Sequence, residues 1–529
     1  MFKIGKTATS GGRHRTKSVT AIKVVLAALT VSSAALFSIS SSGATPKVNP
    51  PGGTLTIAAN QTPVSLNPLD AAIAVPEEWY MDLAYAPFIV HNANGSYSPG
   101  LALSWGYVGT KNETFVMNLR PNVQFSDGST LTAASAAAYI NARAAGQGEA
   151  SFGTTTPASV LGPLTVQVQT TVPNAALPFI FSQSFGGGWV VSPTGLANQS
   201  ELLNQTAGAG PYMLDTAATV ANSTYVYVPN PNYYDPSAIY WSKIIIDVIT
   251  TPAAALAALE TGQVQVMQGS PQLVKTAKAD GLNVGYQPGT DGPAMLVVNV
   301  PTKGPLASVK VRQALSYAIN RPAIANALFG KYATLDEELE APGDIGYVPS
   351  LATYYNYDPA KAKKLLKEAG YPHGFTTSAN CSPQVGDAQI CEAVQSEWAA
   401  IGVKLNVSAP SNQIWVTQLF SGKYPLTGIV SYPTTSAEQS NGYYLPSILT
   451  GKYKIPGVYA AYEAAMAAPV GSATAAADWA KLTKLEMLAA TCIVPGSPDL
   501  IMFSSKSITG VDFTTANPEP YPLTWKSAS

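Results

Sequence analysis

Residues 243–262 read KIIIDVITTPAAALAALETG, and this stretch indicates the fold class of the chain. The apolar run 244–249 is typical of a buried β-strand. Pro252 suits the first turn of a helix and Gly262 suits its end, so a helix is expected from Pro252 to Glu260. A buried strand followed directly by a helix is the repeating unit of α/β folds.

The same alternation continues on both sides of this stretch. Further strands are expected at residues 53–59, 164–172 and 403–407, and a hairpin over 113–131 with its turn at Asp127-Gly128. Helices are expected at residues 133–145, 309–328 with a break near Pro322, 359–369 and 389–400. No repeat of 20–50 residues is visible. The fold class is therefore predicted to be α/β.

Length and composition narrow the function classes. The 529 residues exceed one hydrophobic core and indicate several domains. Only 12% of the residues are charged, about half of ordinary usage, and the formal charge of −1 argues against a nucleic-acid partner. With 3 His and 3 Cys, no dedicated metal site and no cofactor are expected.

The first 44 residues have the pattern of a secretory signal peptide. They hold six basic residues and no acidic one. An apolar run over 24–39 follows, and the small residues Ser42-Gly43-Ala44 then suit the exit from the signal peptide, its cleavage site. The run is short for a membrane anchor, which needs about 20 apolar residues. No cysteine lies near the exit, so no lipid anchor is expected. Without this segment the chain carries a net charge of about −7. The protein is expected to be periplasmic, extracellular or at the cell surface.

Export would place the cysteines in an oxidising compartment. Cys381 and Cys391 are ten positions apart, so a disulfide between them is expected, with two buried free thiols as the alternative. Cys492 lies in an apolar run and is interpreted as a core residue.

The chain shows no catalytic motif of the common hydrolase, zinc-protease or nucleotide-binding classes. After export two histidines remain, His91 and His373, both expected in solvated loops. The acidic residues Asp336, Glu337, Glu338 and Glu340 are interpreted as a solvated helix face rather than a metal site. The protein is therefore predicted not to be an enzyme; a hydrolase would have to recruit one of the two histidines or a pair of carboxylates.

Uncharged side chains that can contact a ligand are abundant instead. Residues 411–445 are rich in aromatic and amide side chains and hold few charges. Such surfaces suit neutral ligands such as sugars or peptide backbones. The alternative is that these are half-buried residues of a large polar protein.

Six motifs occur in a recognisable order, at residues 85–105, 115–128, 210–212, 230–235, 310–320 and 357–371. In this order they resemble the extracellular solute-binding proteins of ABC importers, family 5, the oligopeptide, dipeptide and nickel-binding group. The motifs themselves are interpreted as scaffold. Arg312, in a predicted helix, is expected to bind a carbonyl or carboxylate inside the fold.

The resemblance implies a two-lobed fold like that of type II periplasmic binding proteins, with an extra domain inserted in the first lobe. The implied first lobe comprises residues 51–90, 206–294 and 490–529, the inserted domain 91–205, and the second lobe 295–489. The implied hinges are residues 295–299 and the stretch near Cys492.

The resemblance also places the ligand between the lobes. Residues 60–65 and 412–444 are the implied walls, and Trp189 is a further aromatic candidate. At Ser431 the peptide binders of the family carry an Asp that pairs with the peptide's amine, and a hydroxyl cannot supply that charge-assisted bond. The candidate ligand-binding residues are Gln61, Thr62, Trp189, Asn412, Gln413, Trp415, Ser431, Tyr432 and Asn441.

The implied function is capture of a peptide or similar small polar solute for an ABC permease in the membrane, by a monomeric protein. The loss of the Asp at Ser431 gives weight to an oligosaccharide ligand. A nickel ligand is less favoured with two histidines in the exported chain. A secreted hydrolase, and a surface sensor or chaperone-like protein that uses the same cleft, are the remaining alternatives.

Overall fold

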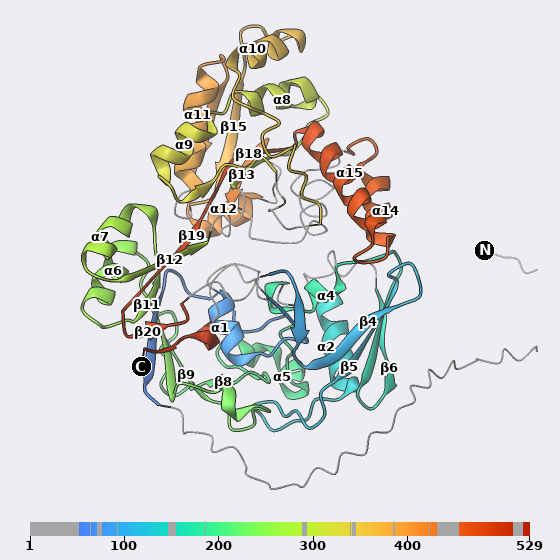
Figure 1. The fold of residues 1–529 in the computed structure, drawn as a ribbon, viewed down its shortest axis with the longest axis vertical. Helices are drawn as coiled ribbons and strands as arrows, with labels where there is room; N and C mark the ends of the chain where they lie inside the picture. The colour runs from blue at the N-terminus through green and yellow to red at the C-terminus, as the bar shows by residue number, and fades with distance from the viewer. Residues whose placement is uncertain are drawn as a thin grey trace, which may run out of the picture. The chain divides into compact units, whose positions relative to one another are not determined.

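The computed structural model describes residues 52–528, except residues 64, 71–76, 93, 146–154, 186, 288–293, 339, 341–344, 384–386, 420, 422, 431–453 and 512–521. The expected signal segment lies outside the described residues. Helices and strands interleave, and two larger sheets organise most of the chain (Figure 1). Within this described part, no helix is both long and apolar enough to cross a membrane.

The first large sheet has β1 at its centre and the strand order β12-β19-β11-β1-β10-β9-β8. β1 pairs in parallel with β10, with Thr54 opposite Lys243, and also in parallel with β11. Helix α6 (Pro252–Glu260) follows β10, so the strand-helix unit predicted from the sequence is confirmed. The strands span β1 (Thr54–Ala59), β8 (Tyr212–Leu214), β9 (Thr224–Pro229), β10 (Lys243–Val248), β11 (Val266–Gln268), β12 (Asn283–Gln287) and β19 (Leu500–Ser504).

The second large sheet has the order β14-β18-β13-β17-β15-β16. Strands β15, β16 and β17 run parallel to one another, whereas β13 and β18 are antiparallel neighbours. Its core includes Trp398 of α11 (Asp387–Ala399) and Leu315 of α8 (Val309–Tyr317). The strands span β13 (Ala294–Val298), β14 (Ala333–Thr334), β15 (Thr376–Cys381), β16 (Lys404–Ser408), β17 (Leu426–Val430) and β18 (Cys492–Pro498).

The chain passes twice between the two sheets. One passage lies between β12 and β13, and the other is Asp499, between β18 and β19. The two expected hinge segments are therefore strands that pair with each other, with Val297 opposite Cys492. Strand β18 pairs with β13 and β14, so the chain leaves the second sheet only at Asp499.

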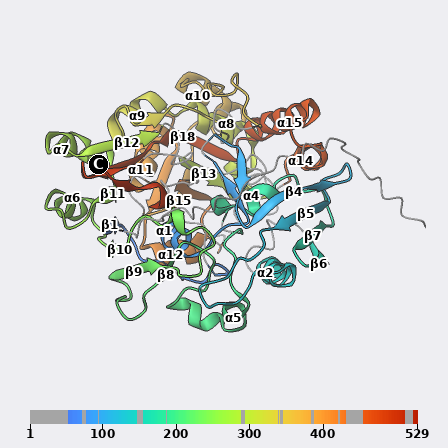
Figure 2. The ribbon, with the colours of Figure 1, turned by 60° about the horizontal axis from the view of Figure 1, so that its bottom comes forward.

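A smaller four-stranded sheet occupies the expected inserted region, with α2 (Ala133–Ala145) packed against it (Figure 2). Its order is β4 (Ala102–Val108), β5 (Thr114–Leu119), β7 (Thr165–Thr170) and β6 (Thr155–Gly162). The expected hairpin over 113–131 is only partly present, because β5 pairs with β4 and β7. The turn at Asp127-Gly128 is present: the Phe125 N–H donates to the Ser129 carbonyl at 2.8 Å, and Gln124 and Thr130 form an isolated bridge.

The helical hairpin of α14 (Val458–Ala467) and α15 (Ala473–Ala489) shares a hydrophobic core with the first sheet and the inserted region. The buried amide of Asn112 donates hydrogen bonds to the carbonyls of Met466 at 2.9 Å and Ala468 at 2.8 Å. Residues assigned to the second lobe thus contact the inserted region directly.

The helix expected at residues 309–328 is two helices, α8 and α9 (Arg321–Leu328). Pro322 stands at the start of α9, and the Asn320 side chain caps that helix by accepting from the Ala323 N–H. Arg312 is fully buried and donates to the carbonyls of Ala489 at 3.0 Å, Leu306 at 2.9 Å and Ala307 at 3.2 Å. This agrees with its expected internal role and ties α8 to the end of α15.

Replacing Arg312 by Met should lower the free energy of unfolding by about 3 kcal/mol or more, because three carbonyls lose their donor and two of them lie in the core. Chemical denaturation measures the loss. Lys310→Met is the matched control on the same helix and should lose far less stability, because its ion pair with Glu368 is exposed to solvent. Equal losses for the two variants would contradict the structural role of Arg312.

Candidate functional site

The carboxyl ends of β15, β16 and β17 form one edge of the second sheet, at Cys381, Ser408 and Val430. Ligands of open sheets with parallel strands bind beyond this kind of edge. Helix α12 (Asn412–Leu419) begins directly after β16 and brings the predicted residues Asn412, Gln413 and Trp415 to it. The structure describes the backbone of Asn412 and Gln413 but not their side chains.

Trp415 is held at this edge by Asn380 of β15. The indole Nε1 donates to the Asn380 carbonyl at 3.4 Å, and the Asn380 amide donates to the Trp415 carbonyl at 3.3 Å. Both residues are buried, and within the described part of the chain the Asn380 Oδ1 atom has no hydrogen-bond partner. Sequence reasoning missed Asn380; the available signal was an amide placed in a strand, directly before Cys381.

Cys381 and Cys391 are joined by an S–S bond of 2.00 Å, and Cys492 is buried and takes no part in a disulfide. The disulfide connects the end of β15 to α11 at the same sheet edge. Gly428 of β17 lies over the two sulfur atoms: a Cβ atom there would collide with Sγ of Cys391 and lie 2.8 Å from Sγ of Cys381. The lack of a side chain at residue 428 is thus required for β17 to pass the disulfide.

Gly428→Ala should therefore destabilise the fold by about 1–3 kcal/mol, because a disulfide sulfur cannot move aside as a flexible side chain can. Thermal unfolding under oxidising conditions measures this. Gly106→Ala is the control, since an added Cβ atom meets nothing within 4 Å there. An unchanged unfolding temperature for Gly428→Ala would contradict the close packing described above.

The predicted residues Gln61 and Thr62 follow the carboxyl end of β1 in the first sheet. Asn60 donates to Gln268, which ends the neighbouring strand β11, at 2.9 Å, and the Tyr80 hydroxyl donates to the Gln61 carbonyl at 3.1 Å. The side chains of Gln61 and Thr62 are half-buried. This edge of β1 and β11 is the counterpart, in the first sheet, of the edge that carries Trp415.

Trp189 lies in the core of the first lobe and inserted region, with 1% of its surface exposed. Its indole Nε1 donates to Oδ1 of Asp82 in α1 (Glu77–Ala84) at 2.9 Å. The N–H group is therefore already used inside the protein. The remaining candidates Ser431, Tyr432 and Asn441 lie outside the described residues.

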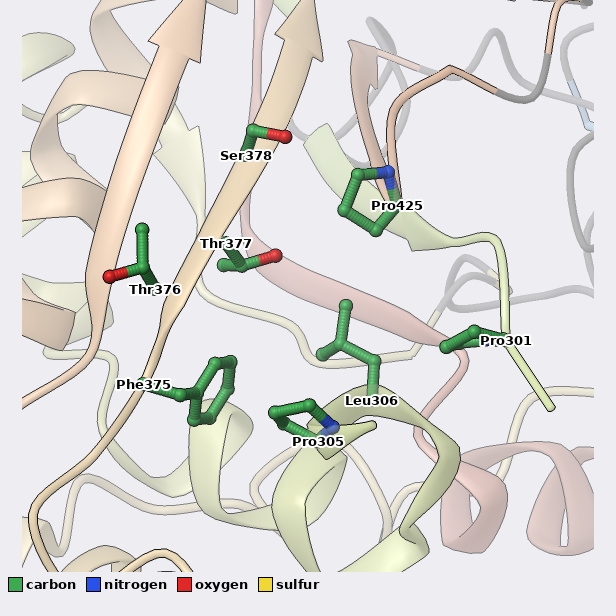
Figure 3. A pocket seen from close by; sticks show the side chains of 8 residues that line it. All are labelled: Pro301, Pro305, Leu306, Phe375, Thr376, Thr377, Ser378 and Pro425. Atoms are coloured by element: carbon green, nitrogen blue, oxygen red, sulfur yellow. The ribbon is translucent and has the colours of Figure 1, made fainter. Parts of the chain in front are cut away.

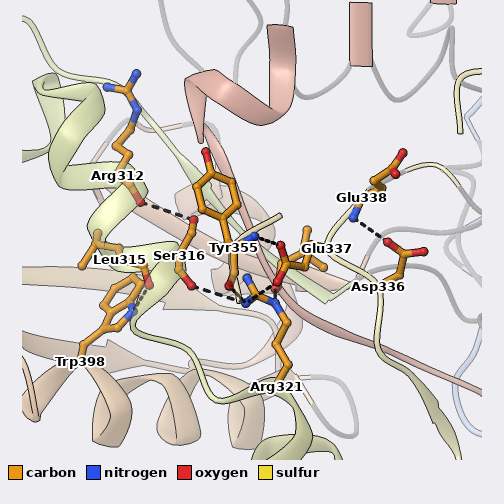
Figure 4. Close-up of polar contacts among 10 residues, drawn as sticks. Arg312, Leu315, Ser316, Arg321, Asp336, Glu337, Glu338, Tyr355 and Trp398 are labelled. Atoms are coloured by element: carbon orange, nitrogen blue, oxygen red, sulfur yellow. Dashed lines mark hydrogen bonds and ion pairs between the residues drawn. The ribbon is translucent and has the colours of Figure 1, made fainter. Parts of the chain in front are cut away.

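The acidic segment after β14 is buried, so its interpretation as a solvated helix face is wrong. Asp336, Glu337, Glu338 and Glu340 are all at most 6% exposed. Arg321 of α9 forms an ion pair with Glu337 at 3.0 Å (Figure 4). This partner lies sixteen positions earlier in the sequence, so local charge pattern alone did not reveal it. Among the described residues, no three His, Cys, Asp or Glu side chains are grouped to hold a metal ion.

His91 is not a solvated loop residue either; it ends β2 (Ile89–His91) and is half-buried. Its ring stacks on Tyr97 at a centroid distance of 4.8 Å and lies edge-on to Phe179 at 5.5 Å. Its Nδ1 atom is 3.2 Å from the Ser184 hydroxyl, which is itself buried. Burial lowers the pKa of His91 to about 4. The second histidine, His373, is exposed.

A neutral His91 in the fold predicts acid sensitivity. An unfolded histidine has a pKa of about 6.5, so the contribution of His91 is complete above that pH and falls as the pH drops toward 4, by up to about 3 kcal/mol. In His91→Phe the ring packing is kept and this titration is absent. Unfolding free energies measured between pH 7 and 4 should thus fall less steeply for the variant; parallel curves would disprove the burial of a neutral ring.

A pocket of about 280 Å³ lies at the opposite, amino-terminal edge of β15 and β17 (Figure 3). Pro301, Pro305, Leu306, Phe375 and Pro425 line it together with residues 376–378. It shares no residue with the carboxyl edge that carries Trp415, so it is separate from the candidate site.

Comparison with known proteins identifies relatives of this chain. The glutathione-binding protein GsiB of Shigella flexneri is 29% identical over 304 residues, which cover 56% of this chain and 58% of that protein. The nickel-binding periplasmic protein of Escherichia coli strain K12 is 29% identical over 327 residues, 58% of this chain and 60% of that protein. The chain thus spans about three fifths of the length of these curated relatives.

A solved structure matches over nearly the whole described chain. The ABC transporter-associated periplasmic binding protein DppA of Helicobacter pylori, in complex with the peptide STSA, superposes with a TM-score of 0.78 at 17% identity, over 90% of this chain and 98% of that one. This likeness shows the two-lobed α/β fold of periplasmic binding proteins. The family model for bacterial extracellular solute-binding proteins, family 5, matches residues 96–450. The chain therefore belongs to the bacterial extracellular solute-binding proteins of family 5.

Proposed function

We propose that this protein is the exported solute-binding protein of an ABC importer, which captures a peptide or similar small polar solute between its two lobes and delivers it to a membrane permease. The main support is the family match over residues 96–450 together with the fold likeness over 90% of the chain. Two large sheets linked by two chain passages fit a mechanism in which lobes close on a solute.

The proposed walls are the two carboxyl sheet edges. Gln61 and Thr62 belong to one wall, and Asn412, Gln413, Trp415, Ser431, Tyr432 and Asn441 to the other. Asn380 is added to the second wall because its buried Oδ1 atom has no partner among the described residues. Trp189 contributes packing rather than a hydrogen bond, because Asp82 occupies its indole N–H. The protein acts as a monomer and is periplasmic or extracellular.

The proposal excludes catalysis by the two histidines. His91 is packed between aromatic rings and lies within hydrogen-bond distance of a buried serine. His373 is exposed and lies in the part of the chain expected to form the second lobe. A bound solute should accordingly be recovered unchanged. Its appearance in cleaved form, in chromatography of the bound fraction, would favour the hydrolase alternative instead.

A thermal-unfolding screen tests the function. Purified protein is heated with short peptides, glutathione, oligosaccharides and nickel chelates. A ligand at about a hundred times its dissociation constant adds roughly 2.7 kcal/mol and raises the unfolding temperature by a few degrees. A shift with peptides supports the proposal as stated, and a shift with oligosaccharides alone would replace the ligand class. No shift with any class would reject the proposal.

Trp415→Ala should weaken binding of the solute found in that screen by roughly 1–3 kcal/mol, as for a buried aromatic anchor. Isothermal calorimetry measures the affinity. Trp105→Ala, a half-buried tryptophan of β4 in the inserted sheet, is the matched control and should bind as tightly as the unaltered protein. Equal affinity for all three proteins would remove Trp415 from the site.

A further inference from the structure

The buried acidic segment lies beside one of the two passages between the sheets. It follows β14, which pairs with Ser497 and Pro498 at the end of β18. The Asp499 N–H, in the passage itself, donates to the Tyr332 carbonyl at 3.1 Å. The segment therefore starts at the base of the region between the lobes, where the proposed function places the solute.

Alternate carboxylates of the segment have different surroundings. Figure 4 shows Glu337 directed toward Arg321 and Tyr355, while Asp336 and Glu338 lie on the other side, where the Asp336 carboxylate accepts from the Glu338 N–H at 2.9 Å. The ion pairs among the described residues include neither of these two. The Tyr347 hydroxyl forms a hydrogen bond with Asp336. Burial and the negative charges of Asp336 and Glu338 raise the pKa of Tyr347.

The carboxyl group of Glu338 is only partly hydrogen-bonded. Its side chain is 2% exposed; one oxygen accepts from the Val348 N–H at 3.0 Å, and the other, Oε1, is buried and has no hydrogen-bond partner among the described residues. Burial, with a smaller contribution from Asp336, raises the pKa of Glu338 to about 8. With that pKa the acid holds its proton near pH 7, and a positive charge beside it would favour the ionised form and displace that proton.

We propose that Asp336, Glu338 and Tyr347 form a subsite for an organic ammonium group of the captured solute. This inference rests on the proposed function. An ammonium group has up to three N–H donors, which matches two carboxylates and a phenol oxygen. A Ca²⁺ ion takes six to eight oxygen ligands, more than this group supplies.

The test uses four probes and isothermal calorimetry on the purified protein. Tetraalanine carries a peptide ammonium and spermidine carries ammonium groups without a peptide, whereas N-acetyl-tetraalanine and maltotetraose carry none. We expect tetraalanine or spermidine to bind at least tenfold more tightly than either probe without an ammonium group, and the better of the two identifies the source of the ammonium. Glu338→Gln should weaken that binding by roughly 10- to 100-fold.

The matched control is Glu368→Gln, which removes one negative charge from an exposed position of the same lobe and should leave affinity unchanged. The amide introduced by Glu338→Gln keeps the shape of the side chain, so this variant should unfold at the same temperature as the unaltered protein or higher. Asp336→Asn is the second variant and should weaken ammonium binding in the same way.

Two kinds of failure can be told apart. If N-acetyl-tetraalanine or maltotetraose binds as tightly as the ammonium probes, or if Glu338→Gln keeps full affinity, the subsite is overturned while solute binding stands. If no probe binds the unaltered protein, both the subsite and the peptide-like solute class are rejected.

Discussion

The antiparallel pair of β13 and β18 is the constraint on which the rest of the architecture depends. Both passages between the large sheets leave from this pair, one before Ala294 and one at Asp499. Neighbouring elements secure it: Arg321 donates to the Val494 carbonyl at 2.7 Å, and the Val298 N–H donates to the Thr491 carbonyl at 2.7 Å. The two passages between the sheets thus adjoin a hydrogen-bonded ladder that belongs to the second sheet.

Charge in this protein is scarce on the whole yet concentrated inside the second lobe. Only 12% of the residues are charged, but Arg312, Arg321, Glu337 and Glu338 are all buried. The two arginines donate to backbone carbonyls from several different segments, so each acts as a multidentate clamp on the backbone. Glu337 forms an ion pair with Arg321, whereas Glu338 belongs to no ion pair among the described residues. A single short segment thus combines a structural ion pair with an unsatisfied acid.

Local patterns predicted most of the elements well. Residues 133–145 and 252–260 are helices with the expected bounds, because Ala-rich runs with clear start and stop residues decide their own conformation. The hairpin over 113–131 was only half right, since β5 finds its partners at residues 102–108 and 165–170. Strand pairing over such distances leaves no local signal. Two predictions of solvent exposure were wrong, one for His91 and one for the acidic residues within 336–340. Partners remote in sequence bury both.

The sequence by itself determined the α/β class, the order of elements, the family resemblance and the pairing of Cys381 with Cys391 as an expectation, because these follow from periodicity, caps, motifs and spacing along the chain. Only the tertiary structure decided that Asn380 holds Trp415, that Gly428 must pass over the disulfide, and that Asp336 and Glu338 lie together on the side away from Arg321. Each of these depends on contacts between segments brought together by sheet register and helix packing, and none of them is written in any local stretch.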